Sequence, residues 1–268
     1  MNDSLSHHEI TIVISSCDHF SDCWDVLSVS LKQFWPDCPF KRYLITNRQN
    51  SNSDQFQAFR TEDDRGWASN LKMVLERLNS EFILYLQEDY WLNRPVDTKA
   101  IEKHLNFCRT YGYDYLRLTF PEYDRGRSDA DGYCVIPTGI RYRLCLQAAL
   151  WRRSKLLEIL VEGWSGWDFE RKIESLLAAQ NISVKAAVLH SSKWPKESIR
   201  YVDGTGVRKG RWTRSGAAYL ADCGMDKLLK RRPKEGCILD FLTHVKTPGF
   251  HQTSRVLVRI MNQLKWNF

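Results

Sequence analysis

Two adjacent carboxylates, Glu88 and Asp89, follow an almost uninterrupted apolar run from Phe82 to Leu86, with Gln87 between. A run of this length is typical of a strand that is buried on both faces in the middle of a parallel sheet. Ligands of open α/β sheets gather at the carboxyl ends of the strands, and paired carboxylates there are suited to hold a divalent cation. The alternative is that Glu88 and Asp89 only open a polar loop or cap the element that follows.

The segments before these carboxylates alternate between strand and helix patterns. The β-branched run Ile10–Ser16 predicts a strand, the apolar spacing over residues 24–34 predicts a helix, and Lys41–Thr46 predicts a second strand. We expect a polar, mobile loop from there to about Arg65. A helix follows, with its apolar stripe at Trp67, Leu71, Val74, Leu75 and Leu78.

After the acidic pair, Ile101, Leu105 and Cys108 predict a helix, and Tyr113–Thr119 predicts a fourth strand. Alternation of this kind builds a parallel sheet covered by helices. Neither GxGxxG after the first strand nor GxxxxGK[ST] is present, so a dinucleotide-binding fold and a P-loop are both disfavoured.

The second half of the chain opens with a charged segment, Pro121–Gly132, which predicts a flexible loop. The patterns after it predict a core strand over Tyr142–Trp151 and a short helix over Ser154–Val161. A second helix opens at residues 163–170, with its apolar stripe at Phe169, Ile173, Leu176 and Leu177. A last strand over Ile182–Leu189 and an amphipathic basic helix over Val256–Trp266 complete the predicted elements.

The 268 residues carry a net charge of +7 and ten Trp. Most of the positive excess lies after Lys185, which indicates an anionic partner such as a nucleotide, phosphates, nucleic acid or an acidic membrane surface. Ten Trp exceed what a core of this size needs, so we expect some of the rings to line a groove that accepts flat sugar or base faces.

The eight Cys form no CxxC pair and have no regular spacing, so neither a zinc site nor a disulfide framework is indicated. Reduced thiols in a cytoplasmic protein fit this distribution. We find no secretory leader pattern and no apolar window long enough to cross a membrane, and a soluble protein is therefore expected.

Several short segments are informative together, by their order and spacing. They are Ser15-Ser16-Cys17-Asp18, Trp35-Pro36-Asp37-Cys38-Pro39 with Tyr43-Leu44-Ile45-Thr46-Asn47, Trp67 with Leu71, Gln87-Glu88-Asp89-Tyr90, residues 146–153, and Gly166-Trp167-Asp168-Phe169-Glu170. With these segments, which span roughly residues 10–190, the chain resembles the GT-A class of nucleotide-sugar glycosyltransferases, in a branch of bacterial surface-polysaccharide biosynthesis such as capsule or lipopolysaccharide.

This resemblance implies a GT-A-like, Rossmann-like α/β fold with a mainly parallel central sheet flanked by helices. The catalytic core would span residues 1–192, with a donor half over about 1–120 and an acceptor half over about 121–192. A basic C-terminal extension, residues 193–268, would pack on this core.

By the same resemblance, Glu88-Asp89 stands where such enzymes carry an Asp-x-Asp motif that holds Mn²⁺ or Mg²⁺ against the donor diphosphate. The metal neutralises charge that builds on the leaving group. Tyr90 replaces the second Asp, so Asp89 is the expected direct ligand and Glu88 its support, through the ribose or a metal-bound water. The departure leaves metal dependence open, with the basic tail as another source of neutralisation.

The resemblance also places Asp168 and Glu170 where inverting GT-A enzymes carry the base that takes the acceptor hydroxyl proton. The alternative for Asp168 is structural, because Ser165-x-x-Asp168 fits a capping box and an acid in a first helical turn is favourable anyway. Glu170, next to the buried stripe, could face the cleft or plain solvent.

Further donor-side candidates follow from position. His190, at the end of a strand, falls where many GT-A enzymes supply a third metal ligand, although a lone His is more often a hydrogen-bonding residue. The remaining candidates are expected to contact the nucleotide, with loop chemistry, core packing or a solvated charged face as their alternatives: Ser16, Asp18, Asn47, Trp67, Asn70, Lys209 and Arg211.

The expected reaction is transfer of one sugar from a nucleotide-diphosphate donor, a UDP-sugar by class, to an oligosaccharide or lipid-linked saccharide acceptor, with inversion. The basic helix over Val256–Trp266 suggests peripheral contact with the inner membrane face, or packing on the core or a dimer contact. The alternatives are a sugar-phosphate nucleotidyltransferase and a non-catalytic binder of nucleic acid or polysaccharide. The first lacks its Gly-rich basic loop here, and the clustered acids argue against a nucleic-acid partner.

Overall fold

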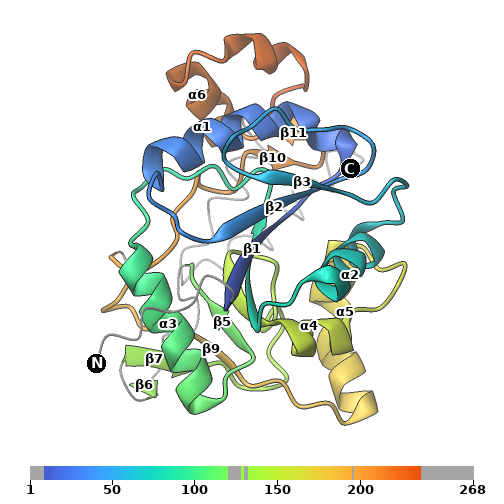
Figure 1. The fold of residues 1–268 in the computed structure, drawn as a ribbon, viewed down its shortest axis with the longest axis vertical. Coiled ribbons are helices and arrows are strands. Elements are labelled where there is room, and N and C mark those ends of the chain that lie inside the picture. The colour runs from blue at the N-terminus through green and yellow to red at the C-terminus, as the bar shows by residue number, and fades with distance from the viewer. Residues whose placement is uncertain (1–8, 120–127, 130–131, 195, 237–268) are drawn as a thin grey trace, which may run out of the picture. The chain divides into compact units, whose positions relative to one another are not determined.

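The computed structural model describes residues 9–119, 128–129, 132–194 and 196–236 (Figure 1). The chain divides into two compact units, Met1–Tyr201 and Val202–Phe268. The expected catalytic core over residues 1–192, its division into donor and acceptor halves and the C-terminal extension over residues 193–268 stay predictions.

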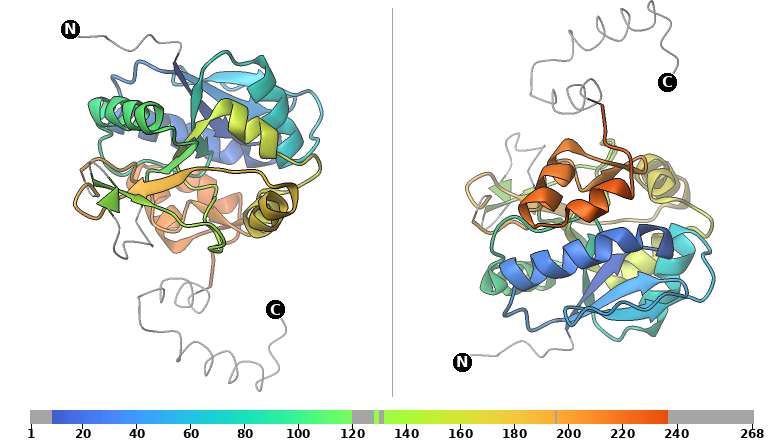
Figure 2. Two further views of the ribbon diagram at one scale, coloured as in Figure 1. Left: turned by 90° about the horizontal axis from the view of Figure 1, so that it is seen from below. Right: turned by 90° about the horizontal axis from the view of Figure 1, so that it is seen from above.

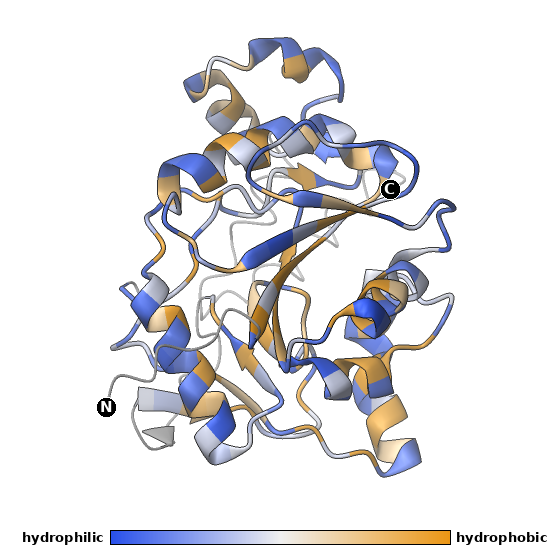
Figure 3. Cartoon of the chain, in the orientation of Figure 1, coloured by the Kyte–Doolittle hydropathy of each residue, from blue (hydrophilic) through white to orange (hydrophobic). Residues whose placement is uncertain are grey.

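The first unit is built on a nine-stranded sheet with the strand order β3-β2-β1-β4-β8-β5-β9-β7-β6. Its parallel half contains β1 (Ile10–Ser15), β2 (Lys41–Thr46), β3 (Gln57–Arg60) and β4 (Phe82–Gln87). β1 pairs in parallel with both β2 and β4, and β2 pairs in parallel with β3. Side chains along β1 are all buried, as a strand covered on both faces requires. Figure 3, which colours each residue by its hydropathy, shows that the strand is largely hydrophobic.

The other half of the sheet contains β5 (Tyr115–Arg117), β9 (Ala186–Leu189), β7 (Tyr133–Val135), β6 (Ser128–Asp129) and β8 (Ala149–Arg152). β8 is antiparallel to both of its neighbours, and β7 is antiparallel to both β9 and β6. The other described strands of this sheet share one direction. The expected mainly parallel α/β fold is thereby confirmed.

Two expectations about strands were wrong. The loop expected up to about Arg65 contains β3, a short edge strand that is only partly covered and held by backbone pairing, so it carries no apolar pattern. The core strand expected over Tyr142–Trp151 is limited to β8. Its first part is buried at Leu144, Cys145 and Leu146, but it follows an irregular path with a positive φ of 61° at Tyr142.

The expected helices of the first unit are confirmed, because their apolar stripes are the residues that the structure buries. α2 (Trp67–Arg77), α4 (Arg153–Ile159) and α5 (Gly166–Gln180) pack in one cluster against one face of the sheet, whereas α1 (Trp24–Phe34) and α3 (Thr98–Tyr111) lie beside each other on the other face (Figures 1 and 2). A short 3-10 helix, η1 (Asp18–Cys23), joins β1 to α1.

The second unit contains a hairpin of β10 (Val207–Arg208) and β11 (Arg211–Trp212), then α6 (Arg214–Asp222) and the 3-10 helix η3 (Asp226–Lys230). Gly216 allows the helix to approach the hairpin, because a Cβ there would lie 2.3 Å from the Gly206 oxygen.

Two expectations fall on other parts of the chain. The C-terminal amphipathic helix lies outside the described residues, as does most of the loop over residues 121–132. Among the helices that the structure describes, none is long and apolar enough to cross a membrane.

His104 is buried in the first unit and provides a test of this packing. Its Nε2 donates to the Glu197 carbonyl oxygen at 2.9 Å, and its Nδ1 therefore accepts from the Tyr133 hydroxyl at 2.8 Å. Burial lowers the pKa of His104 to about 4. An unfolded His takes up its proton at about pH 6.5, before the folded one does.

We therefore expect the free energy of unfolding to fall as the pH drops from about 6.5 to about 4, by about 3 kcal/mol from this group. Urea denaturation across this range should show the decrease in the natural chain and in the exposed-site control His19→Gln, and a much weaker one in His104→Gln. An equal pH dependence in His104→Gln would contradict this account.

Candidate active site

The predicted acidic pair lies in a tight turn at the carboxyl end of β4. The Tyr90 amide donates to the Gln87 carbonyl at 3.1 Å, and Glu88 and Asp89 occupy the turn between them. The Glu88 amide donates to the Ser15 carbonyl at 3.3 Å, which joins this turn to the end of β1. Both acidic residues are largely enclosed, with 8% and 6% of their surface exposed. Two carboxylates therefore stand at the edge where parallel strands end.

Tyr90, the departure from the two-aspartate pattern, is part of the core. Its hydroxyl donates to the Leu146 carbonyl at 2.7 Å, and its ring stacks on Tyr201 with centroids 4.2 Å apart. Burial raises the pKa of Tyr90 well above its usual value, so the phenol stays neutral. An ionised carboxylate in its place could not donate to the Leu146 carbonyl, so this contact would be lost.

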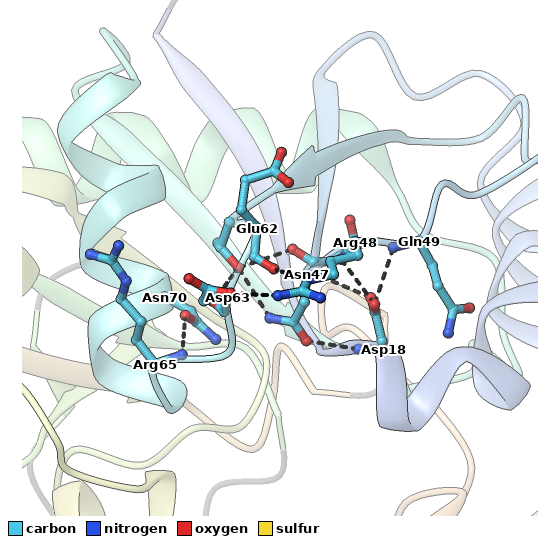
Figure 4. A network of polar contacts seen from close by, with 10 residues as sticks. Asp18, Asn47, Arg48, Gln49, Glu62, Asp63, Arg65 and Asn70 are labelled. Carbon is cyan, nitrogen blue, oxygen red and sulfur yellow. Dashed lines mark hydrogen bonds and ion pairs between the residues drawn. The ribbon is translucent and has the colours of Figure 1, made fainter.

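Asp18 fixes the loop that follows β2 (Figure 4). Its carboxylate accepts the backbone amides of Asn47, Arg48 and Gln49 at 2.8, 2.9 and 3.1 Å. Asn47 returns the contact, because its Oδ1 accepts the Asp18 amide at 3.1 Å. The two residues, both predicted to contact the nucleotide, thus meet each other at the ends of β1 and β2.

The clamped loop is tied onward to the segment before α2 (Figure 4). The Asn47 side chain donates to the Thr61 hydroxyl at 3.0 Å, and Arg48 pairs with Asp63 at 2.9 Å. Asn70, on the first turn of α2 and 3% exposed, accepts the Arg65 amide at 3.1 Å and donates to Asp64 at 2.8 Å. Asn70 therefore holds the loop that leads into α2, a role that loop chemistry explains without a nucleotide.

Trp67 connects α2 to β4. Its indole nitrogen donates to the Tyr85 hydroxyl at 2.9 Å, and the Gln87 side chain donates to the same oxygen at 3.1 Å. The Trp67 ring also packs on Phe169 with centroids 5.3 Å apart. Ser16 has a comparable role, because its hydroxyl accepts the Trp24 indole at 2.9 Å and so ties β1 to α1.

The capping interpretation of Asp168 is the one that the structure displays. Ser165 and Asp168 form a reciprocal capping box at the start of α5, and Lys172 pairs with the Asp168 carboxylate at 2.7 Å. The Lys172 ammonium and the Ser165 hydroxyl hold the pKa of Asp168 well below its usual value. A carboxylate with so low a proton affinity is a weak base at neutral pH.

Glu170 faces the protein segment that precedes β8. Its Oε1 accepts the Leu146 amide at 2.7 Å, and the residue is half-buried. Since Tyr90 bonds the Leu146 carbonyl, the turn after β4 and the first turn of α5 hold the same peptide segment from two sides. Glu170 and Tyr90, the residue that follows the acidic pair, therefore bond the amide and the carbonyl of the same residue, Leu146.

His190 follows β9, which is the third neighbour of β4 in the sheet. At a spacing of about 4.8 Å per strand, the ends of these two strands lie about 14 Å apart. The ring Nδ1 contacts the Ser192 hydroxyl at 2.8 Å. In the described residues no three His, Cys, Asp or Glu side chains form a group that could hold a metal ion. The metal role of His190 stays a prediction.

A metal ion at Glu88-Asp89 does not require such a group. Magnesium in phosphate-transfer sites is commonly bound by one or two protein carboxylates together with substrate phosphates. Two adjacent, largely enclosed carboxylates at the carboxyl edge of the sheet fit that donor set.

Lys209 and Arg211 belong to the second unit. Lys209 and Gly210 form the two-residue turn between β10 and β11, with φ of 49° and 73°. The side chains of Lys209 and Arg211 are both exposed. Positive φ at both positions matches the twist of a tight hairpin. Contact of these side chains with a diphosphate stays a prediction.

One residue at this edge escaped the sequence reasoning. Arg117, the last residue of β5, is 1% exposed and donates to the Tyr142 carbonyl at 2.6 Å and the Arg143 carbonyl at 3.1 Å. It fixes the irregular segment that leads to Leu146. The available signal was a cation inside an otherwise apolar strand.

No protein-family model matches the chain, and no curated protein matches it. Three solved structures have partly similar folds. S. aureus TarS 1-349 in complex with UDP-GlcNAc is 15% identical over 68% of this chain and 56% of that chain, with a TM-score of 0.46. A cytidylyltransferase from Leptospira borgpetersenii is 11% identical over 74% of this chain and 82% of that chain, with a TM-score of 0.43, and a nucleotidyl transferase from Methanothermobacter is 12% identical over 84% of this chain and 99% of that chain, with a TM-score of 0.47. This chain spans little more than half of the TarS fragment. Each similarity is low and concerns the arrangement of strands and helices alone.

The Asp18 clamp predicts that Asp18→Asn lowers the free energy of unfolding by about 1–3 kcal/mol, because an amide replaces a charged acceptor of three amides. It should also speed hydrogen exchange at the amides of residues 47–49. Hydrogen exchange read by mass spectrometry checks this, with the exposed Asp25→Asn as control. Unchanged exchange at residues 47–49 would show that the clamp does not hold the loop.

Proposed function

We propose that the chain is a glycosyltransferase that moves one sugar from a nucleotide-diphosphate donor to a saccharide acceptor, with inversion at the anomeric carbon. The observation that carries the proposal is the pair of enclosed carboxylates, Glu88 and Asp89, in the turn where β4 ends beside β1. A nucleotide-binding crevice at the carboxyl ends of parallel strands is the common arrangement in open α/β sheets.

The surroundings of this pair favour a preformed donor site. The ends of β1, β2 and β4 are neighbours in the sheet, and the loops after them are fixed by side-chain contacts to backbone amides, above all from Asp18. A rigid loop gives up little conformational freedom when a ligand binds, which leaves more of the binding energy for orientation of the donor. Ser16, Asp18, Asn47 and Asn70 would then shape the nucleotide pocket through the backbone that they position.

In this proposal Glu88 and Asp89 would hold Mn²⁺ or Mg²⁺, with Asp89 as direct ligand and Glu88 as support. The ion supplies neutralisation of the negative charge on the donor diphosphate. Tyr90 contributes by fixing the turn, since its hydroxyl and ring are both committed to the protein.

For the acceptor, the proposal assigns the proton-accepting role to Glu170 in preference to Asp168. The acceptor hydroxyl oxygen forms a bond to the anomeric carbon, the bond from that carbon to the diphosphate oxygen breaks with its electron pair leaving on the diphosphate, and the hydroxyl proton passes to the carboxylate. Asp168 is the weaker base because Lys172 and Ser165 lower its pKa. The Glu170 carboxylate accepts a hydrogen bond from the Leu146 amide.

The sugar-phosphate nucleotidyltransferase alternative fits this site less well. Such an enzyme would present a Gly-rich, cationic loop after β1. In this chain that position carries Asp18, whose carboxylate is directed at the loop after β2. A non-catalytic nucleic-acid binder is likewise disfavoured by the acids at the strand ends.

The donor site is tested by Asp89→Asn and Glu88→Gln, with the exposed Glu76→Gln on α2 as matched control. We expect Asp89→Asn to lower transfer from a panel of nucleotide sugars by about 100-fold or more, because charge stabilisation at the leaving group is lost, and Glu88→Gln to lower it less. The measurement is the rate of slow donor hydrolysis in the presence of Mn²⁺, followed by chromatography, for each variant and each nucleotide sugar of the panel. Normal activity in Asp89→Asn would remove the metal-site assignment, and strong salt-sensitive nucleic-acid binding would favour the non-catalytic alternative.

The base assignment is tested by Glu170→Gln against Asp168→Asn. We expect Glu170→Gln to lower kcat for transfer by about 10²–10⁴-fold, with donor binding retained in calorimetric titration. Asp168→Asn should keep most of the transfer rate and lose helix-capping stability. The reverse pattern would assign the base to Asp168.

A further inference from the structure

Trp167 is the most exposed of the large hydrophobic residues on the described surface. Its exposed fraction is 60%, compared with 43% for Val135 and 38% for Val29 and Tyr111. A large aromatic ring gains favourable free energy when it leaves water. Single exposed hydrophobic residues are common on protein surfaces, so the exposure of Trp167 gains its meaning from the position of the ring beside the candidate site.

The packing of the first turn of α5 holds this ring outward. A Cβ at Gly166 would lie 2.7 Å from the end of the Leu146 side chain, which would have to shift to make room, and 3.9 Å from Trp67, so the helix start packs closely on both residues. The Ser165–Asp168 capping box fixes the turn, and the Ala68 amide bonds the Trp164 carbonyl at 3.2 Å. The start of the helix is thus pinned on several sides, and Trp167 is exposed on a rigid element.

One face of the Trp167 ring has a partner on its own helix. The Arg171 guanidinium lies 5.7 Å from the ring centroid, at cation–π distance. Trp164, three residues earlier, is a different case because it packs at the edge of the core cluster. Of these two rings, Trp167 is the one that the structure presents to solvent.

A short series of contacts connects Trp167 to the candidate site. Gln87, the residue before Glu88, donates to the Tyr85 hydroxyl, and Trp67 donates to the same oxygen. Trp67 packs under Gly166, the neighbour of Trp167 in the chain. The exposed ring therefore stands on the helix turn that adjoins the acidic pair through buried contacts, and on the turn that also carries Glu170.

We propose that Trp167 is the stacking platform for a sugar ring of the acceptor. This inference rests on the proposed function. It adds a residue that would bind the acceptor sugar, which the proposed function does not assign. The C–H face of a pyranose is apolar and its edges are hydroxyls, so a sugar covers one aromatic face while its hydroxyls stay in water or reach polar side chains. Arg171, at cation–π distance from the ring, is one such polar partner.

The first test compares Trp167→Ala and Trp167→Phe in steady-state transfer, with Tyr111→Ala on α3 as an exposed aromatic control. We expect Trp167→Ala to raise the acceptor KM about tenfold, which corresponds to about 1.4 kcal/mol. The donor KM and the rate of donor hydrolysis without acceptor should not change, and Trp167→Phe should keep most of the acceptor affinity. An unchanged acceptor KM in Trp167→Ala would overturn the proposal.

The second test does not depend on turnover. The chain is labelled with 5-fluorotryptophan, the Trp167 resonance is assigned from Trp167→Phe, and a panel of methyl hexosides and N-acetylhexosaminides is titrated. A shift of the Trp167 resonance with a saccharide, and not with nucleotide alone, supports the platform. No shift with any saccharide of the panel overturns it, as does a dimer in light scattering that Trp167→Ala dissolves, because the ring would then serve self-association.

Failure of this inference is distinguishable from failure of the proposed function. If donor binding and hydrolysis are absent while the Trp167 resonance still responds to saccharide, the transferase proposal fails and the sugar platform stands. If the donor reaction proceeds and Trp167→Ala leaves the acceptor KM unchanged, the reverse holds.

Discussion

The parallel pairing of β1 with β4 is the constraint on which the rest of the first unit depends. Ile10 pairs with Phe82 at one end of the register and Ser15 with Gln87 at the other, and both strands are buried along nearly their whole length. A slip by one residue would exchange the two faces of β4 and turn the Tyr85 hydroxyl away from Trp67. Because both strands are apolar until their last residues, the first polar groups emerge together, at one edge. The acidic turn stands there as a consequence of the core.

At that edge, side chains that looked like ligand contacts serve mainly to hold backbone. The Asp18 carboxylate accepts three backbone amides of the loop after β2, and the Asn47 side chain accepts the Asp18 amide (Figure 4). The Asn70 side chain accepts the Arg65 amide and so holds the loop that leads into α2. A site whose loops are fixed in advance holds a ligand at lower entropic cost and keeps catalytic groups in place. The polar residues at the strand ends would therefore contribute through the shape of the pocket more than through direct hydrogen bonds to a nucleotide.

The segment before β8 joins the two acidic regions. Tyr90 bonds the Leu146 carbonyl, Glu170 bonds the Leu146 amide, and Arg117 fixes the carbonyls just upstream. A shift of this peptide segment would move the turn after β4 and the start of α5 together. The same helix start carries the exposed Trp167. The turn after β4 and the start of α5 are thus linked through a short, largely buried piece of irregular backbone, whose polar groups are bonded in part by these side chains.

The sequence by itself determined the elements whose signal is local. The helix over residues 24–34 and the strand Lys41–Thr46 coincide with α1 and β2, because their apolar spacing is also the pattern that tertiary packing buries. The sequence also determined the position of the acidic pair, because the end of a long apolar run is visible in the sequence without knowledge of tertiary contacts. The tertiary structure decided what depends on contacts far apart in the chain. β3 is an edge strand without an apolar stripe, and residues 142–148 are buried without being a strand, because their backbone pairs with Arg117 and Glu170. The role of Asp18 likewise follows from loop amides far away in the chain, and the exposure of Trp167 follows from the packing around the start of α5. For Asp168 the spacing already predicted the capping box with Ser165, and the structure adds the ion pair with Lys172, which lowers the pKa of the carboxyl.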